Sequence, residues 1–400
     1  MSALKSYITV TVAYWAFTLT DGALRMLVVL YFHQLGFDAL SIAFLFLFYE
    51  LFGVVTNLLG GWLAARFGLN KTLFAGLILQ VSALYLLSFE SYLSVAYVMF
   101  AQAISGIAKD LNKMSAKSSL KLLLPQEAEG TLFKWVALLT GSKNTLKGVG
   151  FFLGGFLLQW QGYENSLLTL MVGLSTVAIA CWLTMPGELN AGRVKVKFKQ
   201  LFSKSPLVNY LSAARFFLFG ARDVWFVIAL PVFLQTQLNW QHAQVGTLMA
   251  GWIILYGIVQ SITPKLLGFQ SPTHAPTARN AIIAVAGLLL VLLVMIVANY
   301  LSLDITYNII LGLLGFALVF AVNSAIHSYL ILSYSAQKNV SLDVGFYYMS
   351  NAAGRLAGTL LSGLVFLKAG FVACLWTSAM MIFLCLLITI KLKYAEKVSS

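Results

Sequence analysis

The segment Gly150-Phe-Phe-Leu-Gly-Gly-Phe156 has a counterpart, Gly358-Thr-Leu-Leu-Ser-Gly-Leu364, at an offset of 208 residues (358 minus 150). A second pair, Gly53-Val-Val-Thr-Asn57 and Gly257-Ile-Val-Gln-Ser261, is offset by 204 residues (257 minus 53). The third pair consists of two isolated acids in apolar runs, Asp21 and Asp223, offset by 202 residues. Because the offset changes so little over three separate segments, the sequence predicts a duplicated unit.

The composition indicates that these units lie in a lipid bilayer. Of the 400 residues, 60% are hydrophobic and only 10% are charged, whereas a soluble domain has about 25% charged residues. A membrane-spanning helix needs about 20 mostly apolar residues, and the chain contains twelve such runs. They lie at 7–32, 40–63, 72–89, 93–116, 131–160, 163–185, 207–235, 242–263, 280–299, 305–333, 341–367 and 370–390. We therefore predict an all-α membrane protein with an N-terminal six-helix bundle (1–190), a linker (191–206) and a C-terminal six-helix bundle (207–400).

The distribution of Lys and Arg predicts the orientation of the spans. With a cytoplasmic N-terminus, sixteen Lys and Arg residues lie in inner segments and one, Lys368, lies outside. This bias predicts cytoplasmic termini and location in the cell inner membrane. The net charge of +13 is then a topology signal and does not indicate nucleic-acid binding. The basic run Arg193 to Lys199 is predicted to contact anionic lipid, with a regulatory role as the alternative.

The sequence shows no pattern typical of a metal site, a cofactor site or an enzyme. Cys181, Cys374 and Cys385 lie in apolar runs and form no Cys-x-x-Cys motif, so neither a disulfide nor a metal is predicted. A membrane-embedded transferase would need clustered acids or a nucleophile with its base. A sensor would need a soluble signalling domain. Neither feature is visible.

Charged residues within the predicted spans are the main functional signal. Each costs about 2.5–3.5 kcal/mol on membrane-insertion scales, so its presence there indicates a function. Four are acidic, namely Asp21, Glu50, Asp110 and Asp223, and seven are basic, namely Arg25, Lys109, Lys113, Lys143, Lys147, Arg222 and Arg355. Seven minus four leaves three surplus positive charges, which predicts an anionic substrate.

The seven bases form the predicted substrate site. Lys143 and Lys147 share one helix face, and the repeat aligns Lys147 with Arg355. Together these three side chains could hold a phosphate or carboxylate from two sides, because Arg offers a bidentate fork and Lys a point charge. The four acids and His327 are predicted to serve coupling or gating. His327 could titrate near neutral pH or could only make a polar contact with Asn323.

Three local arrangements follow from helix geometry. Asp21 and Arg25 are spaced i, i+4 and could neutralise each other, or one could face the substrate. Arg222 and Asp223 are adjacent, point about 100° apart on a helix of 3.6 residues per turn, and are predicted not to pair. Lys117 lies near a span end and is predicted to extend toward the lipid head groups.

One loop motif resembles a known family. The segment Gly61-Trp-Leu-Ala-Ala-Arg66-Phe-Gly68-Leu-Asn-Lys71 is similar to the inner-loop signature of the major facilitator superfamily. The resemblance implies gating roles for Gly61, Arg66 and Gly68, although Ala65 stands where the family has an acid. It also implies alternating access, with a substrate site between the two bundles. Gly141, Gly150 and Gly154 resemble the exporter-associated glycine motif, with Gly155 in place of its usual proline.

A narrower resemblance concerns three segments, Tyr14 to Leu30, Gly106 to Lys117 and Leu139 to Lys147. They resemble the organoarsenical efflux permeases (the ArsJ family). The resemblance implies export of 1-arseno-3-phosphoglycerate and thus arsenate resistance. It also implies a functional partner, the glyceraldehyde-3-phosphate dehydrogenase that makes this compound from arsenate. The residues alone leave open an organophosphate or other organic-anion exchanger. They also leave open whether transport is uniport or proton antiport through Asp21, Glu50 or Asp223.

Overall fold

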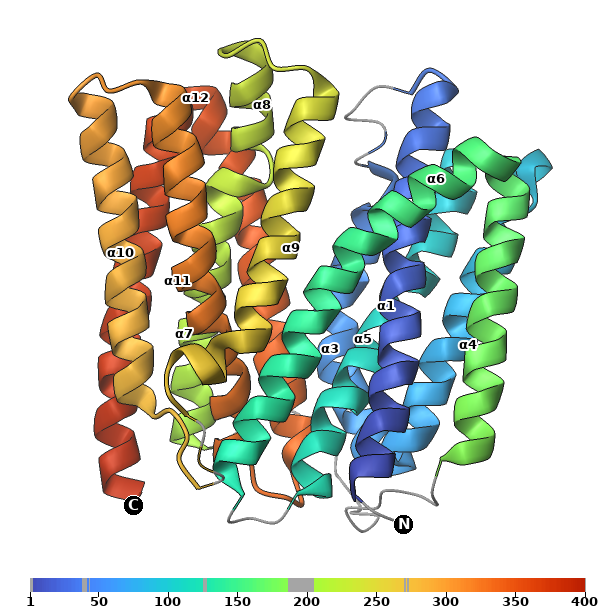
Figure 1. Ribbon diagram of the computed structural model, residues 1–400, viewed down its shortest axis with the longest axis horizontal. Coiled ribbons are helices and arrows are strands. Elements are labelled where there is room, and N and C mark those ends of the chain that lie inside the picture. The colour runs from blue at the N-terminus through green and yellow to red at the C-terminus, as the bar shows by residue number, and fades with distance from the viewer. Residues whose placement is uncertain are drawn as a thin grey trace. The chain divides into compact units, whose positions relative to one another are not determined.

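The chain is almost entirely helical in this computed structural model (Figure 1). The structure describes residues 3–37, 42, 44–124, 128–185, 205–269, 271 and 273–399, and it contains no strand within those ranges. The predicted linker over 191–206 lies outside the described residues except for Ser205 and Pro206.

The helices correspond to the twelve predicted spans. In the first part of the chain they are α1 (Ala3–Gln34), α3 (Leu47–Phe67), α4 (Leu69–Leu87), the short η1 (Glu90–Tyr92), α5 (Val95–Leu123) and α6 (Glu129–Thr184). In the second part they are α7 (Pro206–Phe226), α8 (Ala229–Thr236), α9 (His242–Leu266), α10 (Ala278–Tyr300), α11 (Ile305–Tyr334) and α12 (Val340–Ser399). The all-α prediction is confirmed.

The count of spans follows from helix length and composition. In the described part of the chain, nine helical segments are long and apolar enough to cross a membrane, with α7 and α8 joined as one segment. Two of the nine, α6 and α12, are 56 and 60 residues long and hold two predicted spans each. The helix α5, which is rich in lysine, is the remaining span, so nine plus two plus one gives twelve.

Glycine divides each of the two long helices. Gly162 in α6 has φ 78° and Gly370 in α12 has φ 76°, values that side chains with a Cβ rarely adopt. Each glycine therefore lets the chain turn between one span and the next without a longer loop. The two positions are again 208 residues apart (370 minus 162), as the repeat predicts.

The described chain forms two compact units. Unit 1 comprises residues 1–126, 142–202 and 335–349, and unit 2 comprises 127–141, 203–334 and 350–400. The first turns of α6 thus pack within unit 2, and the first turns of α12 pack within unit 1. The division into bundles 1–190 and 207–400 stays a prediction about the repeated sequence.

Corresponding helices occupy the centre of each unit. In unit 1, α5 packs against α1, α3 and α4, and in unit 2, α11 packs against α7, α9 and α10. The helices α5 and α11 are the fourth span of the first repeat and the fourth of the second. Both carry long runs of buried residues, which include Asp110 and Lys117 in α5 and Asn323, Ser324 and His327 in α11.

Glycines allow two helix pairs to approach closely. In unit 1, a Cβ at Gly150 of α6 would lie 2.6 Å from the backbone oxygen of Leu19 in α1. In unit 2, a Cβ at Gly358 of α12 would lie 2.4 Å from the backbone oxygen of Gly220 in α7. No side chain fits at such separations, so small residues are required at these crossings. The glycine segments that indicated the duplication are therefore helix contacts in both units.

A second pair of close contacts involves the first turns of the long helices. In unit 1, a Cβ at Gly61 of α3 would lie 2.4 Å from the Ser341 backbone oxygen and 3.1 Å from the Cα of Gly345 in α12. In unit 2, a Cβ at Gly141 of α6 would lie 2.5 Å from the Gly257 backbone oxygen in α9. Gly61 thus serves close packing, which is compatible with its predicted gating role.

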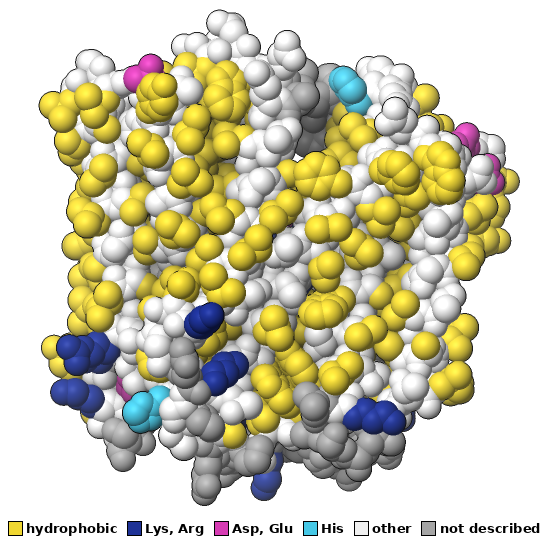
Figure 2. All heavy atoms as spheres, viewed as in Figure 1, with side chains coloured by type: hydrophobic (Ala, Val, Ile, Leu, Met, Phe, Trp, Pro, Cys, Tyr) yellow, Lys and Arg dark blue, Asp and Glu magenta, His cyan; other side chains and the backbone are white. Residues whose placement is uncertain are grey.

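The outer surface suits lipid. Large apolar side chains are widely exposed, including Trp160, Leu183 and Leu367, which retain 71%, 72% and 83% of their accessible area. Figure 2 shows hydrophobic side chains over most of the visible surface of each unit, with Lys and Arg gathered at one end of its helices. Such exposure exceeds what a soluble monomer tolerates in contiguous patches. The polar interior of each unit is therefore the unusual part of the molecule.

Candidate substrate site

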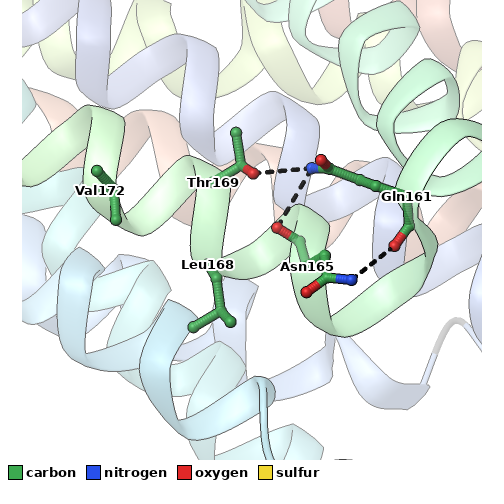
Figure 3. Close-up of a pocket in the computed structure, with 5 residues that line it drawn as sticks. All are labelled: Gln161, Asn165, Leu168, Thr169 and Val172. Carbon is green, nitrogen blue, oxygen red and sulfur yellow. Dashed lines mark hydrogen bonds between the residues drawn. The ribbon is translucent and has the colours of Figure 1, made fainter.

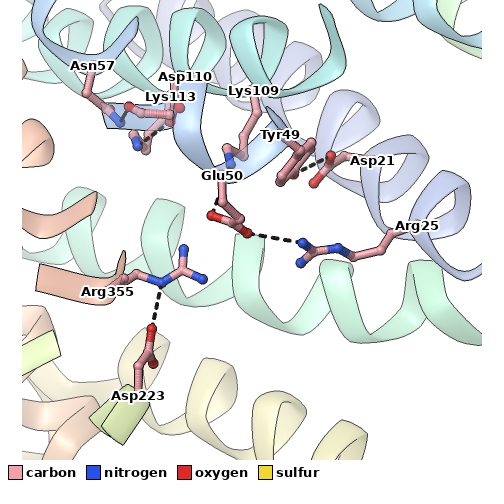
Figure 4. A network of polar contacts seen from close by, with 11 residues as sticks. Asp21, Arg25, Tyr49, Glu50, Asn57, Lys109, Asp110, Lys113, Asp223 and Arg355 are labelled. Carbon is pink, nitrogen blue, oxygen red and sulfur yellow. Dashed lines mark hydrogen bonds and ion pairs between the residues drawn. The ribbon is translucent and has the colours of Figure 1, made fainter. Parts of the chain in front are cut away.

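A cluster of charged side chains in unit 1 joins α1, α3 and α5 (Figure 4). Arg25 Nη2 lies 3.1 Å from Glu50 Oε1, and Lys109 Nζ lies 4.0 Å from Glu50 Oε2. The ring of Tyr49 lies between the same two cations, 4.9 Å from the Arg25 guanidinium carbon and 3.8 Å from Lys109 Nζ. Glu50 and Tyr49 thus bring two positive charges together.

Asp21 takes a different partner from the one its spacing suggested. Its Oδ1 accepts a 2.7 Å hydrogen bond from Tyr49 Oη, and Asp21 is only 5% exposed. The self-neutralising Asp21–Arg25 pair is not formed, because Arg25 extends to Glu50 instead. Spacing along one helix allows a pair, but a third side chain on a neighbouring helix decides it.

Asp110 forms the second ion pair of this cluster. Its Oδ1 lies 2.5 Å from Lys113 Nζ, as the i, i+3 spacing allows, and its side chain is 1% exposed. Its other oxygen, Oδ2, is buried and has no hydrogen-bond partner among the described residues. A Cβ at Gly53 of α3 would lie 3.1 Å from that oxygen. Gly53, one of the repeat residues, therefore makes room for this carboxylate.

The prediction that the Lys117 side chain extends toward the lipid head groups is wrong. Lys117 is 3% exposed, and its Nζ donates to Tyr348 Oη in the first turns of α12. The Tyr348 ring also lies 4.6 Å from Lys117 Nζ and 4.7 Å from Lys113 Nζ. Within unit 1, the aromatic face and the hydroxyl of Tyr348 give Lys117 a buried partner, so its side chain does not extend to the head groups.

Lys147 contributes a further positive charge to unit 1. It lies half-buried in α6, where its backbone oxygen would be 2.7 Å from a Cβ at Gly22 of α1. Its ammonium group is close enough to Asp21 and Arg25 to interact with their charges. It forms no hydrogen bond or ion pair with any residue that the structure describes. Its neighbour Lys143, by contrast, does have a polar or electrostatic partner.

Unit 2 holds a smaller charged cluster. Asp223 in α7 is fully buried, and its Oδ1 lies 2.6 Å from Arg222 Nη2. Its Oδ2 accepts from Arg355 Nε of α12 at 3.1 Å. The expectation that Arg222 and Asp223 cannot pair is wrong, because the long, flexible Arg222 side chain folds back to its neighbour. One carboxylate thus serves two guanidinium groups.

The buried charge of Arg215 in α7 is absent from the residues predicted from the sequence. It is 3% exposed, and it donates from Nε to Asn351 Oδ1 at 2.9 Å and from Nη1 to Ser324 Oγ at 3.3 Å. The sequence feature that could have revealed this charge is a single arginine in the apolar run from Leu211 to Gly220. The flanking aromatic residues obscured it, because Arg215 packs its guanidinium 3.9 Å from the Phe219 ring centroid.

His327 lies in α11 near Arg215, and it is fully buried. Both ring nitrogens, and both amide atoms of Asn323, lack a hydrogen-bond partner among the described residues. The two side chains therefore do not satisfy each other, although their i, i+4 spacing would allow it. Neither side chain takes part in the charged clusters described above.

Arg66 and Gly68 lie where α3 ends. Gly68 has φ 99° and caps α3, and its N–H donates to the Ala64 backbone oxygen. The Arg66 guanidinium carbon lies 5.1 Å from the centroid of the Trp62 ring. With Ala65 at the usual acidic position, the arginine packs on an aromatic ring within its own helix, and its predicted gating role stays a prediction.

Other features of the described residues lie outside these charged clusters. The described residues include no group of three or more His, Cys, Asp or Glu that could hold a metal ion. The three cysteines are free and buried. A surface pocket beside the Gly162 turn is lined by Gln161, Asn165, Leu168, Thr169 and Val172 (Figure 3). These side chains are uncharged, and Gln161 is already hydrogen-bonded to Thr169 at 2.8 Å.

The fold and the buried charges are those of a polytopic membrane transporter. The sequence pattern of the Major Facilitator Superfamily matches residues 10–337. The chain therefore belongs to this superfamily, as the loop motif at Gly61 implied. No curated protein matches the chain in sequence.

Several solved structures share the fold. The human organic anion transporter MFSD10 (TETRAN) is similar with a TM-score of 0.73 and 16% identity over 97% of this chain and 98% of that one. A bacterial homologue of the iron transporter ferroportin in an outward-facing state has a TM-score of 0.74 and 12% identity over 98% of both chains. The proton:xylose symporter XylE, bound to 6-bromo-6-deoxy-D-glucose, has a TM-score of 0.74 and 13% identity, covering 97% of this chain and 95% of that one. At these identities the likeness shows the fold alone.

Proposed function

We propose that this protein exports an organic anion across the cell inner membrane by alternating access, and that the anion is 1-arseno-3-phosphoglycerate. The observation that carries the proposal is the positive surplus within the spans of unit 1. There, Glu50 is shared by Arg25 and Lys109, and Lys147 adds a further charge with no described ion-pair partner. An anion among these groups would offset their mutual repulsion.

The types of base fit an anion with oxygen atoms. Arg25 can bind a phosphate, arsenate or carboxylate with two parallel hydrogen bonds, and Lys109 and Lys147 can approach as point charges. A cation transporter would be expected to show a surplus of acids instead. Lys113 and Lys143 remain predicted substrate residues of unit 1, and Arg222 and Arg355 those of unit 2.

The choice of substrate rests on sequence resemblance. The segments Tyr14 to Leu30, Gly106 to Lys117 and Leu139 to Lys147 resemble the organoarsenical efflux permeases, and they contain Asp21, Arg25, Lys109, Lys113 and Lys147. The human protein MFSD10, which has the same fold, is an organic anion transporter, so its substrates carry the same sign of charge as the substrate proposed here. Under this proposal the functional partner is glyceraldehyde-3-phosphate dehydrogenase.

The membrane potential favours such export. Moving one negative charge out of an inside-negative cell releases about 2.3 kcal/mol per 100 mV. A multivalent anion could therefore leave without a coupled ion. Proton antiport would need a carboxylate that changes protonation, for which Asp21, Glu50, Asp110 and Asp223 are the candidates in the spans.

A second candidate function is exchange of organophosphates or other organic anions. It is favoured by the generic chemistry of the cluster, because Arg and Lys bind phosphate and arsenate esters alike. Direct comparison of substrates separates the two functions.

The decisive experiment is uptake by everted membrane vesicles. Vesicles with the protein should accumulate 1-arseno-3-phosphoglycerate in preference to 3-phosphoglycerate and inorganic arsenate. Equal uptake of 3-phosphoglycerate would favour the exchanger. Uptake of arsenate alone would contradict the organoarsenical proposal while leaving an anion site in place.

A cellular experiment tests the partner. Arsenate resistance should require both this protein and a dehydrogenase that makes the organoarsenical. Cells with and without added glyceraldehyde-3-phosphate dehydrogenase are compared for growth in arsenate. The same protection in both would point to export of inorganic arsenate.

A further inference from the structure

In unit 2, an acid of α7 and a base of α12 form an ion pair between two helices in contact. Asp223 Oδ2 lies 3.1 Å from Arg355 Nε, and the carboxylate is fully buried. The repeat in the sequence aligns this acid with Asp21 of α1 (223 minus 21 is 202). It aligns the base with Lys147 of α6 (355 minus 147 is 208). Both units therefore carry one acid and one base at corresponding places.

The helices that carry Asp21 and Lys147 are also in direct contact. Trp15 Nε1 of α1 donates to Ser142 Oγ of α6 at 2.7 Å. Further along the same two helices, a Cβ at Gly22 would lie 2.7 Å from the Lys147 backbone oxygen. Because Gly22 directly follows Asp21, the acid and the lysine lie at the same level of this helix contact. Their side-chain charges are close enough to interact.

The acid and the base of unit 1 nevertheless do not form an ion pair with each other. Asp21 Oδ1 accepts its hydrogen bond from the uncharged Tyr49 hydroxyl at 2.7 Å (Figure 4). Lys147 forms no ion pair or hydrogen bond with any residue that the structure describes. Its ammonium group interacts instead with the charges of two further bases, Arg25 and Lys109, as well as with that of Asp21. Unit 1 thus has the components of the unit 2 pair in an open arrangement.

The empty transporter has to change state without its anion. In alternating access, the bundles move around the substrate site, and the site is withdrawn from water on the way. A bound anion offsets the surplus of positive charge. Without the anion, Glu50 serves Arg25 and Lys109, and Lys147 is left without a carboxylate. A charge that leaves water without a partner is strongly disfavoured, so movement of the empty site requires a second acid.

We propose that Asp21 leaves Tyr49 and pairs with Lys147 while the empty transporter reorients. The protein can then export its anion without importing another one in exchange. Under the proposed function, on which this inference rests, the mode of transport is therefore net export. The flexible four-carbon stem of the lysine allows the movement. The pair belongs to the reorienting state and adds nothing to the stability of the arrangement described here, so Asp21 is a positioning residue that acts through Lys147.

The experiment compares two kinds of transport by liposomes that contain the purified full-length protein. The liposomes are loaded with radioactive 1-arseno-3-phosphoglycerate and, in a parallel series, with radioactive 3-phosphoglycerate. Efflux into buffer without substrate measures net export, which requires the empty site to return. Efflux into buffer that contains the same unlabelled compound measures exchange, which does not require that return. Ionophores hold the pH gradient and the membrane potential at zero.

In Asp21→Asn, exchange should persist, and net export should fall at least about tenfold relative to it, as loss of a charge-assisted hydrogen bond predicts. Adding Lys147→Gln to this variant should restore the wild-type ratio of net export to exchange at saturating substrate, because no lysine charge is left to neutralise. An acid that only carried a proton would not be rescued in this way. The matched control Glu164→Gln replaces an exposed acid of unit 1 and should keep the wild-type ratio.

A second variant covers the case in which Asp21→Asn does not fold. Tyr49→Phe keeps the ring between Arg25 and Lys109 but removes the hydroxyl that holds Asp21. The acid is then freer to compete with the anion for Lys147, so apparent affinity for the anion should fall while net export persists.

Four results would overturn the inference. They are exchange without net export in the wild type, a wild-type ratio or an equal loss of both kinds of transport in folded Asp21→Asn, no rescue by Lys147→Gln, and unchanged affinity in Tyr49→Phe. Transport of neither compound by the wild type would refute the proposed function itself, and the inference with it.

Discussion

Arg355 Nε donates to Asp223 Oδ2 across 3.1 Å and joins α12 to α7 within unit 2. The carboxylate is fully buried, whereas the Arg355 side chain is 35% exposed. The acid therefore depends on its partners more than Arg355 depends on the acid. This asymmetry determines what substitution of each residue should do.

Asp223→Asn should destabilise the protein far more than Arg355→Gln. Removing the acid leaves Arg222 and Arg355 facing each other, and loss of one partner of a buried pair costs about 3–5 kcal/mol. Removing Arg355 leaves Asp223 still paired with Arg222 at 2.6 Å. Thermal unfolding in detergent measures both changes.

The control is Glu164→Gln, because Glu164 is exposed. Equal unfolding temperatures for the Asp223 and Arg355 variants would contradict this account of the cluster.

Lys147→Gln should impair transport without destabilising the protein. Lys147 has no described ion-pair or hydrogen-bond partner, so its removal costs no native pair. Loss of a charge-assisted contact with the substrate should weaken apparent affinity about tenfold to a hundredfold. The more stringent variant neutralises Lys143, Lys147 and Arg355 together and should abolish efflux.

Vesicle uptake and unfolding temperature are measured in parallel, with the exposed Lys368→Gln as the control. Intact efflux in the well-expressed triple variant would rule out the anion site that we propose.

Adding a methyl group at the close helix contacts should destabilise the protein. Gly150→Ala and Gly358→Ala place a Cβ 2.6 Å and 2.4 Å from backbone oxygens, and overpacking of this kind costs about 1–3 kcal/mol. Gly173→Ala in α6 and Gly363→Ala in α12 are matched controls, because nothing lies within 4 Å of their added Cβ.

The two sets should change stability in opposite directions, since alanine in an open helical position is favoured over glycine by about 0.5–1 kcal/mol. The readout is the unfolding temperature in detergent. A similar change in all four variants would show that the contacts do not limit packing.

If the protein exports the proposed organoarsenical, replacing all three cysteines by alanine should leave the arsenate resistance that it confers unchanged. Cys181, Cys374 and Cys385 are free, buried and not grouped with other metal-ligating residues in the described chain. Alanine is the suitable replacement because it adds no unsatisfied hydroxyl group. Growth in arsenate is measured at matched protein levels.

Loss of resistance at normal protein level would reveal a thiol–arsenic interaction and would change the proposed chemistry from anion binding to thiol ligation.

Much of the fold could be predicted because its physical cause is local. Apolar runs of about 20 residues can only be satisfied in lipid as helices, which pair all backbone groups within one segment. The described helices follow the predicted spans closely, and α6 and α12 each hold the two spans predicted for them. The repeat was readable because its glycines are fixed by backbone contacts in both units.

The residue types of the candidate site were also readable, since a charge in an apolar run is conspicuous. The ion pairs that these residues form could not be predicted from the sequence. Arg25 pairs with Glu50 on α3 and not with Asp21, and Lys117 is buried against Tyr348, which is 231 residues away in sequence. Arg215 was not predicted as a site residue because the aromatic residues next to it in the sequence make the segment read as an ordinary apolar span.

The residues alone therefore predict twelve membrane-spanning helices, a repeated sequence and a surplus of basic over acidic residues within the predicted spans. The packing of distant helices, by contrast, determines which acid pairs with which base, that Gly53 makes room for Asp110, and that His327 lies near Arg215. The reason is the range of the forces involved. Hydrophobicity and backbone hydrogen bonding act on each segment separately, whereas a buried charge is stabilised by side chains that only the packing of distant helices brings within about 3 Å.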